Sequence, residues 1–249
     1  MDSYRFLSSY YDRFTDDVGY EKWADFFEKI FEREGLKPHL VVDLACGTGT
    51  LTAEMTKRGY EMIGVDASAE MLMQAMNQTI DLNPRPIFLN QRMENLDLFG
   101  TVDACLCCLD SVNYVTDEDA LKTAFEKVHL FLEPNGIFIF DVNTKNKFDY
   151  MNGQCYVRED EDVFCVWQVS FDGDICEYNF DIFEKSDTKW TRLEEQHLEK
   201  YYSSEKLCKM LSDAGFIDIK IYAELSFEPI NQNENRIFIS ARKRKLTNE

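Results

Sequence analysis

The sequence predicts an α/β protein with a mostly parallel sheet and a small antiparallel β insertion. Apolar, β-branched runs alternate with amphipathic helical stretches between residues 40 and 142, and this alternation is typical of right-handed βαβ units. A glycine-containing turn directly follows the first run. Between Val163 and Lys200 the pattern changes to three aromatic and β-branched runs separated by turn residues, which predicts antiparallel hairpins.

Two helices are expected before the first strand, over Ser3–Phe14 and Tyr20–Glu34. The second carries aromatic and aliphatic residues at helical spacing, which predicts one buried face: Trp23, Phe26, Phe27, Ile30 and Phe31. Gly35 and Pro38 end it.

The parallel strands are expected over Leu40–Leu44, Glu61–Val65, Pro86–Leu89, Val102–Leu109 and Ile137–Val142. Helices fill the intervals between most of these strands. Ser68 is a suitable N-cap for one of them. Thr116 and Asp119 resemble a capping box at the start of another.

The insertion begins after the fifth of these strands. Asp172-Gly173-Asp174 and Ser186-Asp187 separate its runs, and Asp-Gly between such runs is a strong hairpin signal. A last helix over Ser204–Ala214 precedes an antiparallel pair, Ile217–Phe227 and Arg236–Ala241. We therefore expect one main domain from residues 1–149 and 203–249, with residues 150–202 inserted as a subdomain that covers the ligand site at the carboxyl ends of the parallel strands.

The charge balance bears on possible partners. Asp and Glu total 46 against 27 Lys and Arg, a formal net charge of −19. Nucleic-acid binding depends on basic contacts to phosphate, so no nucleic-acid partner is expected. The dense basic run at 242–245 is interpreted as a solvated tail. The acidity itself either serves solubility or favours a cationic or amine substrate at an acidic mouth.

Cysteines and apolar segments indicate the compartment. The chain has eight cysteines but no C-x-x-C pair. On a strand, Cys105 and Cys107 face one way and Cys108 the other, so we expect core thiols and no metal site. No stretch approaches the length of about 18 apolar residues that a membrane helix needs. The sequence thus predicts a cytoplasmic protein with no membrane partner.

The turn after the first strand carries the chemical signal. Gly47 and Gly49 lie between a strand and a helix, where glycine lets a ligand approach the backbone. Asp43 lies at the end of the first strand and Asp66 at the end of the second. An acid at the second position reaches the ribose hydroxyls of an adenosine-containing cofactor. The plainer alternatives are that Asp43 caps the turn and that Asp66 favours a helix N-terminus.

These residues resemble a known family. Asp43-x-x-Cys46-Gly47-x-Gly49 is similar to the first motif of class I S-adenosylmethionine-dependent methyltransferases, and Gly64-Val65-Asp66-Ala67-Ser68 to their second. The similarity continues through Tyr10–Asp12, Leu109–Tyr114, Phe138–Asn143 and Glu195–Tyr202. The resemblance is to small bacterial members, and the layout is also similar to amino-sugar N-dimethyltransferases, which carry an antiparallel insertion over the active site. It implies a Rossmann-like sheet with an antiparallel last strand.

The resemblance implies S-adenosylmethionine as cofactor and a set of residues that bind it: Tyr11, Trp23, Asp43, Ala45, Cys46, Gly47, Gly49, Asp66, Ala67, Gln91, Met93 and Asp110. Tyr11 would cover the sulfonium, since an aromatic face suits a cation. Both Tyr11 and Trp23 also suit an ordinary core position. The sequence departs from the family at Arg92, where an Asp is often found, and Arg cannot accept a hydrogen bond from the adenine amino group.

For catalysis the resemblance implies Tyr114, near the transferring methyl group, and His197 in the acceptor site. Tyr is a weak base at neutral pH, so Tyr114 is expected to hydrogen-bond and aim an amine. A lone His such as His197 is also common as a surface residue or a satisfied core residue. The predicted function is methyl transfer to a small-molecule acceptor, with an amine favoured over a hydroxyl or carboxyl group. The sequence leaves the oligomeric state open.

Two other functions remain open. A nicotinamide-dependent oxidoreductase also uses glycines and a downstream acid, but Gly47-x-Gly49-x-x-Thr52 lacks the third glycine of that fingerprint. Tyr202-x-x-x-Lys206 matches a reductase pair only formally, because it spans a predicted strand-to-helix junction. The other alternative is a regulatory module that binds S-adenosylmethionine without catalysis.

Overall fold

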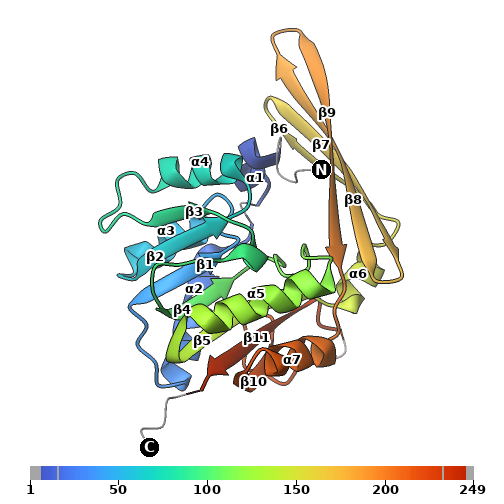
Figure 1. The fold of residues 1–249 in the computed structure, drawn as a ribbon. Coiled ribbons are helices and arrows are strands. Elements are labelled where there is room, and N and C mark those ends of the chain that lie inside the picture. Colours follow the sequence, from blue (N-terminus) through green and yellow to red (C-terminus); the bar gives the residue numbers. More distant parts are fainter. Residues whose placement is uncertain (1–6, 16, 232, 245–249) are drawn as a thin grey trace, which may run out of the picture.

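The structure is a computed structural model that describes residues 7–15, 17–231 and 233–244. Its main body is a seven-stranded sheet in the order β10-β11-β5-β4-β1-β2-β3 (Figure 1). These strands are β1 (Leu40–Leu44), β2 (Glu61–Asp66), β3 (Ile87–Asn90), β4 (Val102–Cys107), β5 (Leu132–Asn143), β10 (Phe216–Ala223) and β11 (Arg236–Lys243). The predicted α/β class with a mostly parallel sheet is confirmed.

The direction of β11 distinguishes this sheet from a fully parallel one. It pairs antiparallel with β5, with Ile237 opposite Val142, and antiparallel with β10 on its other side. The other neighbours, β5 with β4, β4 with β1, β1 with β2 and β2 with β3, are parallel. The antiparallel last strand is therefore confirmed. The expected strand Ile217–Phe227 ends early, since β10 stops at Ala223.

Helices cover both faces of the sheet (Figure 1). One layer contains α2 (Tyr20–Arg33) and α3 (Thr50–Lys57), and the other contains α5 (Glu118–Phe131) and α7 (Ser204–Asp213). Cys105 and Cys107 of β4, and Cys108 directly after it, follow the alternation of the strand: the first two pack toward α5, and Cys108 packs toward α2. All three are buried free thiols. α4 (Ala69–Gln78) follows β2, with Ser68 as its N-cap.

The insertion forms a separate four-stranded antiparallel sheet in the order β6-β7-β8-β9. Its strands are β6 (Cys155–Asp160), β7 (Val163–Asp172), β8 (Ile175–Ser186) and β9 (Lys189–Lys200). Three strands were expected, and β6 is the additional one. A short helix, α6 (Lys145–Met151), joins β5 to this sheet. The Asp172-Gly173-Asp174 turn joins β7 to β8 as predicted, with Gly173 at φ 59°.

Three local expectations need correction. In the described part of the helix expected over Ser3–Phe14, two short pieces occur, η1 (Leu7–Ser9) and α1 (Tyr11–Phe14); residues 3–6 lie outside the described ranges. Helix α5 is capped by Asp117, whose side chain accepts from the N–H groups of residues 119 and 120, and not by Thr116. The basic run is only partly solvated in its described part, because Arg242 is buried in β11 and contacts Glu34, whereas Arg244 is exposed.

The amino-terminal segment packs against the inserted sheet. Leu7 contributes to an apolar cluster with Val163, Cys165 and Ile182 of that sheet. Arg13 of α1 forms ion pairs with Asp160 and Asp162 at 2.5 and 2.8 Å. The first elements of the chain and the insertion are thus held together, although more than 140 residues separate them.

Candidate active site

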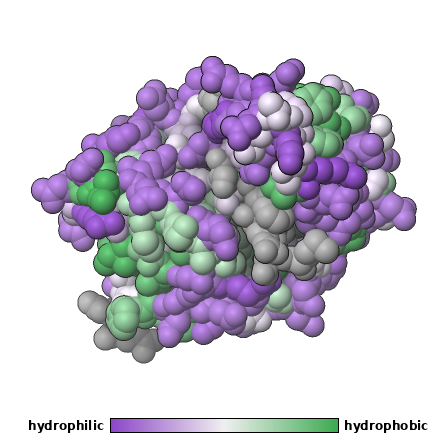
Figure 2. Space-filling view, turned by 90° about the horizontal axis from the view of Figure 1, so that it is seen from above, coloured by the Kyte–Doolittle hydropathy of each residue, from purple (hydrophilic) through white to green (hydrophobic). Residues whose placement is uncertain are grey.

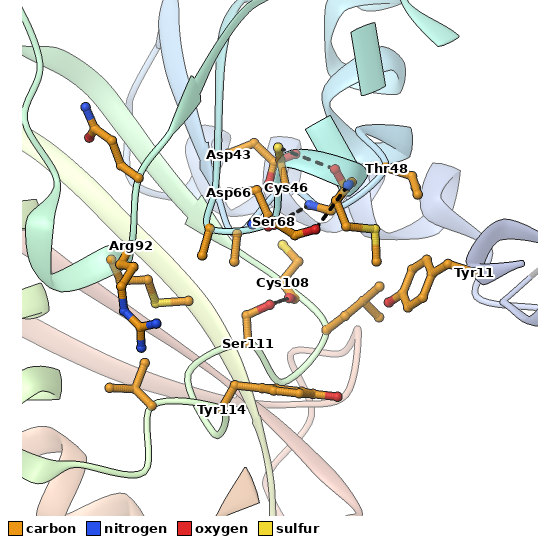
Figure 3. A pocket seen from close by; sticks show the side chains of 18 of the residues that line it. Tyr11, Asp43, Cys46, Thr48, Asp66, Ser68, Arg92, Cys108, Ser111 and Tyr114 are labelled. Atoms are coloured by element: carbon orange, nitrogen blue, oxygen red, sulfur yellow. Dashed lines mark hydrogen bonds between the residues drawn. The ribbon is translucent and has the colours of Figure 1, made fainter. Parts of the chain in front are cut away.

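A cavity of about 670 Å³ opens at the carboxyl ends of β1, β2 and β4. This is the edge where ligands bind in open α/β sheets. Figure 3 shows Tyr114 opposite Asp43 and Asp66, with Arg92 and Tyr11 toward the two ends. The lining comes from the turn after β1, the end of β2, the start of α4, residues 91–94, residues 108–116, the starts of α1 and α2, and β9.

The glycine turn is shaped by close packing and by backbone conformation. Gly49 has φ 79°, and a Cβ built there would meet the Cβ of Ala75 at 2.8 Å. A larger residue is therefore excluded by both sterics and backbone strain. Gly47, at φ 54°, donates its N–H to Asp66 Oδ2 at 2.9 Å. Thr48 donates to Asp12 Oδ1 at 2.6 Å, which brings α1 to the turn.

Asp66 lies at the end of β2 on the cavity lining. Its Oδ1 accepts the N–H of Ser68 at 2.8 Å, in addition to the bond from Gly47. A carboxylate has about four lone-pair positions, so two backbone bonds leave room for two hydroxyl donors. Burial raises the pKa of Asp66, so a ligand that hydrogen-bonds to the charged form is favoured.

Asp43, at the end of β1, also lines the cavity. It is 1% exposed, and Thr52 of α3 donates to its Oδ2 at 2.5 Å. Burial, together with the negative charge of Asp66, raises the pKa of Asp43 to about 7. One buried acid and one half-buried acid beside the same cavity create a negative potential there, which suits a cationic ligand.

The segment after β3 forms the end of the cavity near Arg92 (Figure 3). Gln91 holds this segment through both amide atoms, which bond the backbone of Asp97. Arg92 donates Nε to Glu94 Oε1 at 2.6 Å, and both side chains line the cavity with Met93. The position where an Asp is expected is therefore occupied by Arg92, and this Arg pairs with Glu94.

The loop after β4 adopts an uncommon backbone. Leu109 and Asp110 have φ values of 56° and 52°, and a left-handed non-glycine residue costs about 1–3 kcal/mol. Arg236 at the start of β11 opposes this cost: it bonds Asp110 Oδ1 at 2.6 Å and also pairs with Asp141. Asp141 Oδ2 accepts the N–H of Asp110 at 2.9 Å. The Arg236 cluster, defined as Asp110, Asp141 and Arg236, thus fixes the loop that carries Tyr114.

A second set of buried polar contacts joins this loop to the inserted sheet. Asn113 donates to the carbonyl oxygen of Lys200 at 2.8 Å and accepts the N–H of Asn143 at 3.0 Å. Asn143 donates to Glu199 Oε2 at 3.0 Å. Burial raises the pKa of Glu199 well above its usual value. These bonds fix the position of β9 relative to the cavity.

Tyr114 connects the cavity to buried groups of β9. Its hydroxyl lies 3.1 Å from His197 Nδ1, and His197 Nε2 lies 2.7 Å from Glu195 Oε1. His197 is 1% exposed and Glu195 is 6% exposed. The N–H of Leu7 donates to Glu195 Oε2 at 3.1 Å. His197 is therefore part of a hydrogen-bonded chain.

Most residues predicted for the site line this one cavity: Tyr11, Asp43, Ala45, Cys46, Gly47, Asp66, Ala67, Gln91, Met93 and Tyr114. Four others lie outside its lining. Gly49 packs closely against Ala75. His197 is connected to the cavity through its contact with Tyr114. Asp110 turns its carboxylate to Arg236. Trp23 is 3% exposed and packs on Phe238 in the core.

The cavity also includes residues that sequence reasoning did not select: Tyr20, Ser111, Gln196 and Leu198. Glu195 had one available signal, since residues two apart on a strand share a face and His197 was already a candidate. No sequence feature pointed to Arg236, because an Arg at the start of a strand is common. The aromatic residues of the insertion pack on one another, as Trp167 does on Tyr156 and Phe180.

Within the described ranges, no group of His, Cys, Asp and Glu is arranged to hold a metal ion. No helix in that part of the chain combines the length and apolarity needed to cross a membrane. The face seen in Figure 2 is mostly hydrophilic, with apolar side chains in small separate patches.

Comparisons with known proteins bear on this geometry. Residues 41–136 match the family described as "Methyltransferase domain". A relative from Bacillus subtilis (strain 168), named "Putative methyltransferase YqeM", is 30% identical over 97% of this chain and 98% of its own. The crystal structure of an S-adenosylmethionine-dependent methyltransferase from Clostridium acetobutylicum ATCC 824 is 30% identical, with a TM-score of 0.86 over 96% of this chain and 98% of that one.

The sugar N-methyltransferase KedS8 from Streptoalloteichus sp ATCC 53650 has the same fold, with a TM-score of 0.82 over 98% of this chain and 95% of its own, at 17% identity. The chain belongs to the class I S-adenosylmethionine-dependent methyltransferases. Its cofactor is S-adenosylmethionine. The nicotinamide alternative is thereby set aside, and Tyr202 is a core residue whose hydroxyl donates to the carbonyl oxygen of Val115 at 2.5 Å.

The residues present fit this cofactor. The cavity volume lies within the range of about 300–1,000 Å³ that is usual for ligand sites. The cofactor carries a sulfonium and an ammonium charge, and Asp43 and Asp66 supply opposite charge beside the glycine turn. The open backbone at Gly47, where a Cβ would meet nothing within 4 Å, leaves space for a ligand to approach.

Proposed function

We propose that this protein transfers a methyl group to an amine of a small molecule that binds between the cofactor and the inserted sheet. The observation that carries the proposal is the division of charge along the cavity. Its charged side chains all come from the ends of β1 and β2, the start of α4 and residues 91–94, which we assign to the cofactor half: Asp43, Asp66, Glu70, Arg92 and Glu94. The acceptor half is lined by uncharged side chains: Tyr11, Tyr20, Leu109, Ser111, Tyr114, Val115, Gln196 and Leu198.

In the cofactor half we assign roles from the positions of the groups. Asp66 binds the ribose hydroxyls with its remaining lone pairs. The backbone of Ala45–Gly47 lies along the methionine part, and Asp43 orients the turn through Thr52. Gln91, Met93 and the neighbouring Ala67 lie at the adenine end. Trp23 and Asp110 act indirectly, because both contact Arg236.

In the acceptor half we assign Tyr114 to the reacting amine and Tyr11 to the region of the sulfonium. S-adenosylmethionine supplies an electrophilic methyl group on a sulfonium. The protein aligns the acceptor with that group and excludes water, which is the main requirement of an in-line transfer. Residues 150–202 serve as the cover, since Gln196 and Leu198 of β9 line the cavity.

Two further observations support a small amine acceptor over a nucleic acid. The net charge of −19 disfavours a polyanion. The fold is also that of the sugar N-methyltransferase KedS8, although a likeness at 17% identity identifies no substrate. A hydroxyl acceptor would need a stronger base than a neutral amine does.

The test is transfer of labelled methyl groups from S-adenosylmethionine to a metabolite extract freed of protein and RNA. We expect label in compounds retained by a cation exchanger, with wild-type protein but not with Asp66→Ala. Label in purified tRNA, rRNA or protein instead would overturn the proposal. Binding of S-adenosylhomocysteine without transfer to any fraction would favour the regulatory module.

A further inference from the structure

We propose that Tyr114, His197 and Glu195 form a proton-accepting chain that takes a proton from the acceptor amine. This inference rests on the proposed function, because it assigns the acceptor to the Tyr114 side of the cavity. It adds a task for two residues that do not line the cavity. In this scheme Tyr114 is the catalytic residue, while His197 and Glu195 act through it.

The distances form a continuous path from the cavity to a buried carboxylate. Tyr114 lines the cavity, its hydroxyl is 3.1 Å from His197 Nδ1, and the other ring nitrogen is 2.7 Å from Glu195 Oε1. Both distances lie in the range of ordinary hydrogen bonds. A tyrosine hydroxyl can donate only to an unprotonated Nδ1, so the path requires the proton of the neutral ring on Nε2.

The position of Glu195 is fixed by segments from distant parts of the chain. Its second oxygen accepts the N–H of Leu7, and the alternation of β9 places its side chain on the same face as His197. Burial of the carboxylate strengthens its effect on an adjacent imidazolium, because the local dielectric is low. The carboxylate thus orients the ring and stabilises its protonated form.

Other ionisable groups surround His197. Tyr178 of β8 lies directly opposite it in the antiparallel register, and burial raises the pKa of Tyr178. Glu199 follows two positions along β9, and Cys165 of β7 is close enough to Glu195 for their charges to interact. Burial raises the pKa of Glu199 well above its usual value and raises the pKa of Cys165 to about 12. Tyr178 and Cys165 stay protonated near neutral pH, and Glu195 is the carboxyl group in direct contact with the ring.

An ammonium acceptor gives one proton to the Tyr114 oxygen as the Tyr114 hydroxyl proton moves to His197 Nδ1, which leaves a neutral amine and an imidazolium. The amine lone pair then forms the bond to the methyl carbon as the carbon–sulfur bond breaks and its electron pair stays on sulfur. The imidazolium returns its proton to solvent through Tyr114 once the product has left. No oxidant or further reactant is needed.

The first test measures the ring itself and needs no acceptor. The chain has three histidines, so ¹⁵N spectra of histidine-labelled protein with bound S-adenosylhomocysteine are simple to assign by a His197→Gln variant. At neutral pH we expect His197 to carry its proton on Nε2 alone, and Tyr114→Phe to shift the Nδ1 resonance. A ring protonated on Nδ1, or an Nδ1 resonance that Tyr114→Phe leaves unmoved, would overturn the chain.

The second test compares Glu195→Gln with Glu194→Gln, whose carboxylate is exposed on the other face of the same strand. The single-turnover rate with the amine found above should fall about 100-fold in Glu195→Gln, the usual size of a proton-transfer contribution. The low-pH limb of its rate profile should also move to lower pH, because glutamine stabilises the imidazolium less. Glu194→Gln should match wild type.

The outcomes separate the two proposals. If an amine is methylated but the two Gln variants share one profile, the proton chain is wrong and the proposed function stands. If S-adenosylhomocysteine binds and the ring has the expected tautomer but no amine is methylated, the proposed function fails. Equal S-adenosylhomocysteine affinity in both variants shows that Glu195→Gln is folded.

Discussion

The two halves of the cavity are built in different ways. The cofactor half comes from one stretch of chain: the ends of β1 and β2, the turns after them and residues 91–94. The acceptor half brings together Tyr11, Tyr114 and Leu198 from segments that lie far apart in the sequence. The first half depends on local motifs and carries the charge, whereas the second depends on tertiary contacts and is uncharged.

This difference separates what each half requires. The cofactor half needs glycines at fixed positions and acids at strand ends, as Gly49 against Ala75 illustrates. The acceptor half needs a strained loop and the inserted sheet to be held in place, which Arg236 and Asn113 do through buried bonds. Substitutions should therefore affect the two halves separately, except where they disturb the Arg236 cluster.

The largest effect is expected at that cluster. Arg236→Met leaves Asp110 and Asp141 without their buried cation, and breaking such a pair costs about 3–5 kcal/mol of unfolding free energy. Burial already raises the pKa of Asp141, to about 6, and the charge of Arg236 opposes that rise. Removing the cation raises the pKa further, so the loss should grow as pH increases. Urea denaturation at two pH values measures it.

Arg236→Lys keeps the charge and is the matched variant; it should lose clearly less stability than Arg236→Met. Equal stability of wild type and Arg236→Met would show that the cluster does not hold the loop.

The cofactor half is tested at the ribose position. Asp66→Ala should weaken S-adenosylhomocysteine binding about ten- to hundred-fold, or roughly 1.5–3 kcal/mol, since it removes a charge-assisted contact. Calorimetry measures this. Asp97→Ala, an exposed acid near the same segment, is the control and should bind as wild type does. Unchanged affinity in Asp66→Ala would contradict the assignment.

The pH dependence of cofactor affinity should belong to the cofactor half alone. Burial raises the pKa of Asp43 to about 7, so its charged form destabilises the unliganded fold as pH rises through that value. A cationic ligand stabilises the charged form of Asp43 and so lowers its pKa. Affinity for S-adenosylmethionine should therefore rise with pH, by about tenfold for each unit by which binding lowers that pKa. Proton release on binding, measured in two buffers, checks it. Asp43→Asn should abolish the pH dependence of affinity. If that variant kept the full dependence, a group other than Asp43 would be responsible for it.

The smallest effect is expected at the tip of the inserted sheet. Trp190 is 52% exposed there and lies outside the cavity lining. Trp190→Ser should change unfolding free energy by less than about 0.5 kcal/mol and leave methyl transfer unaltered. A strong loss of transfer would mean that the tip, and not only Gln196 and Leu198, meets the acceptor.

The sequence predicted the fold, and it predicted that the glycine turn and the acids at the strand ends lie together at one cavity, because both rest on local patterns. Alternating apolar runs gave the strands, and Asp43, Gly47 and Asp66 follow directly from their positions at strand ends. The acceptor half was predictable only in part. Tyr114 and His197 came from resemblance, but their contact depends on how β9 lies over the loop, which no local pattern contains. Trp23 illustrates the limit, since helical spacing suits a core residue and a site residue equally.

The division of the cavity is tested most directly by filling one half. Leu198→Trp places a larger ring in the acceptor half, at a side chain that lines the cavity and is 40% exposed. We expect S-adenosylhomocysteine affinity to stay within about twofold of wild type, since the ring does not reach the cofactor contacts, while transfer of labelled methyl groups to the cation-exchanged fraction falls at least about 100-fold. Transfer at the wild-type rate, or an equal loss of cofactor binding, would contradict a cavity divided in this way.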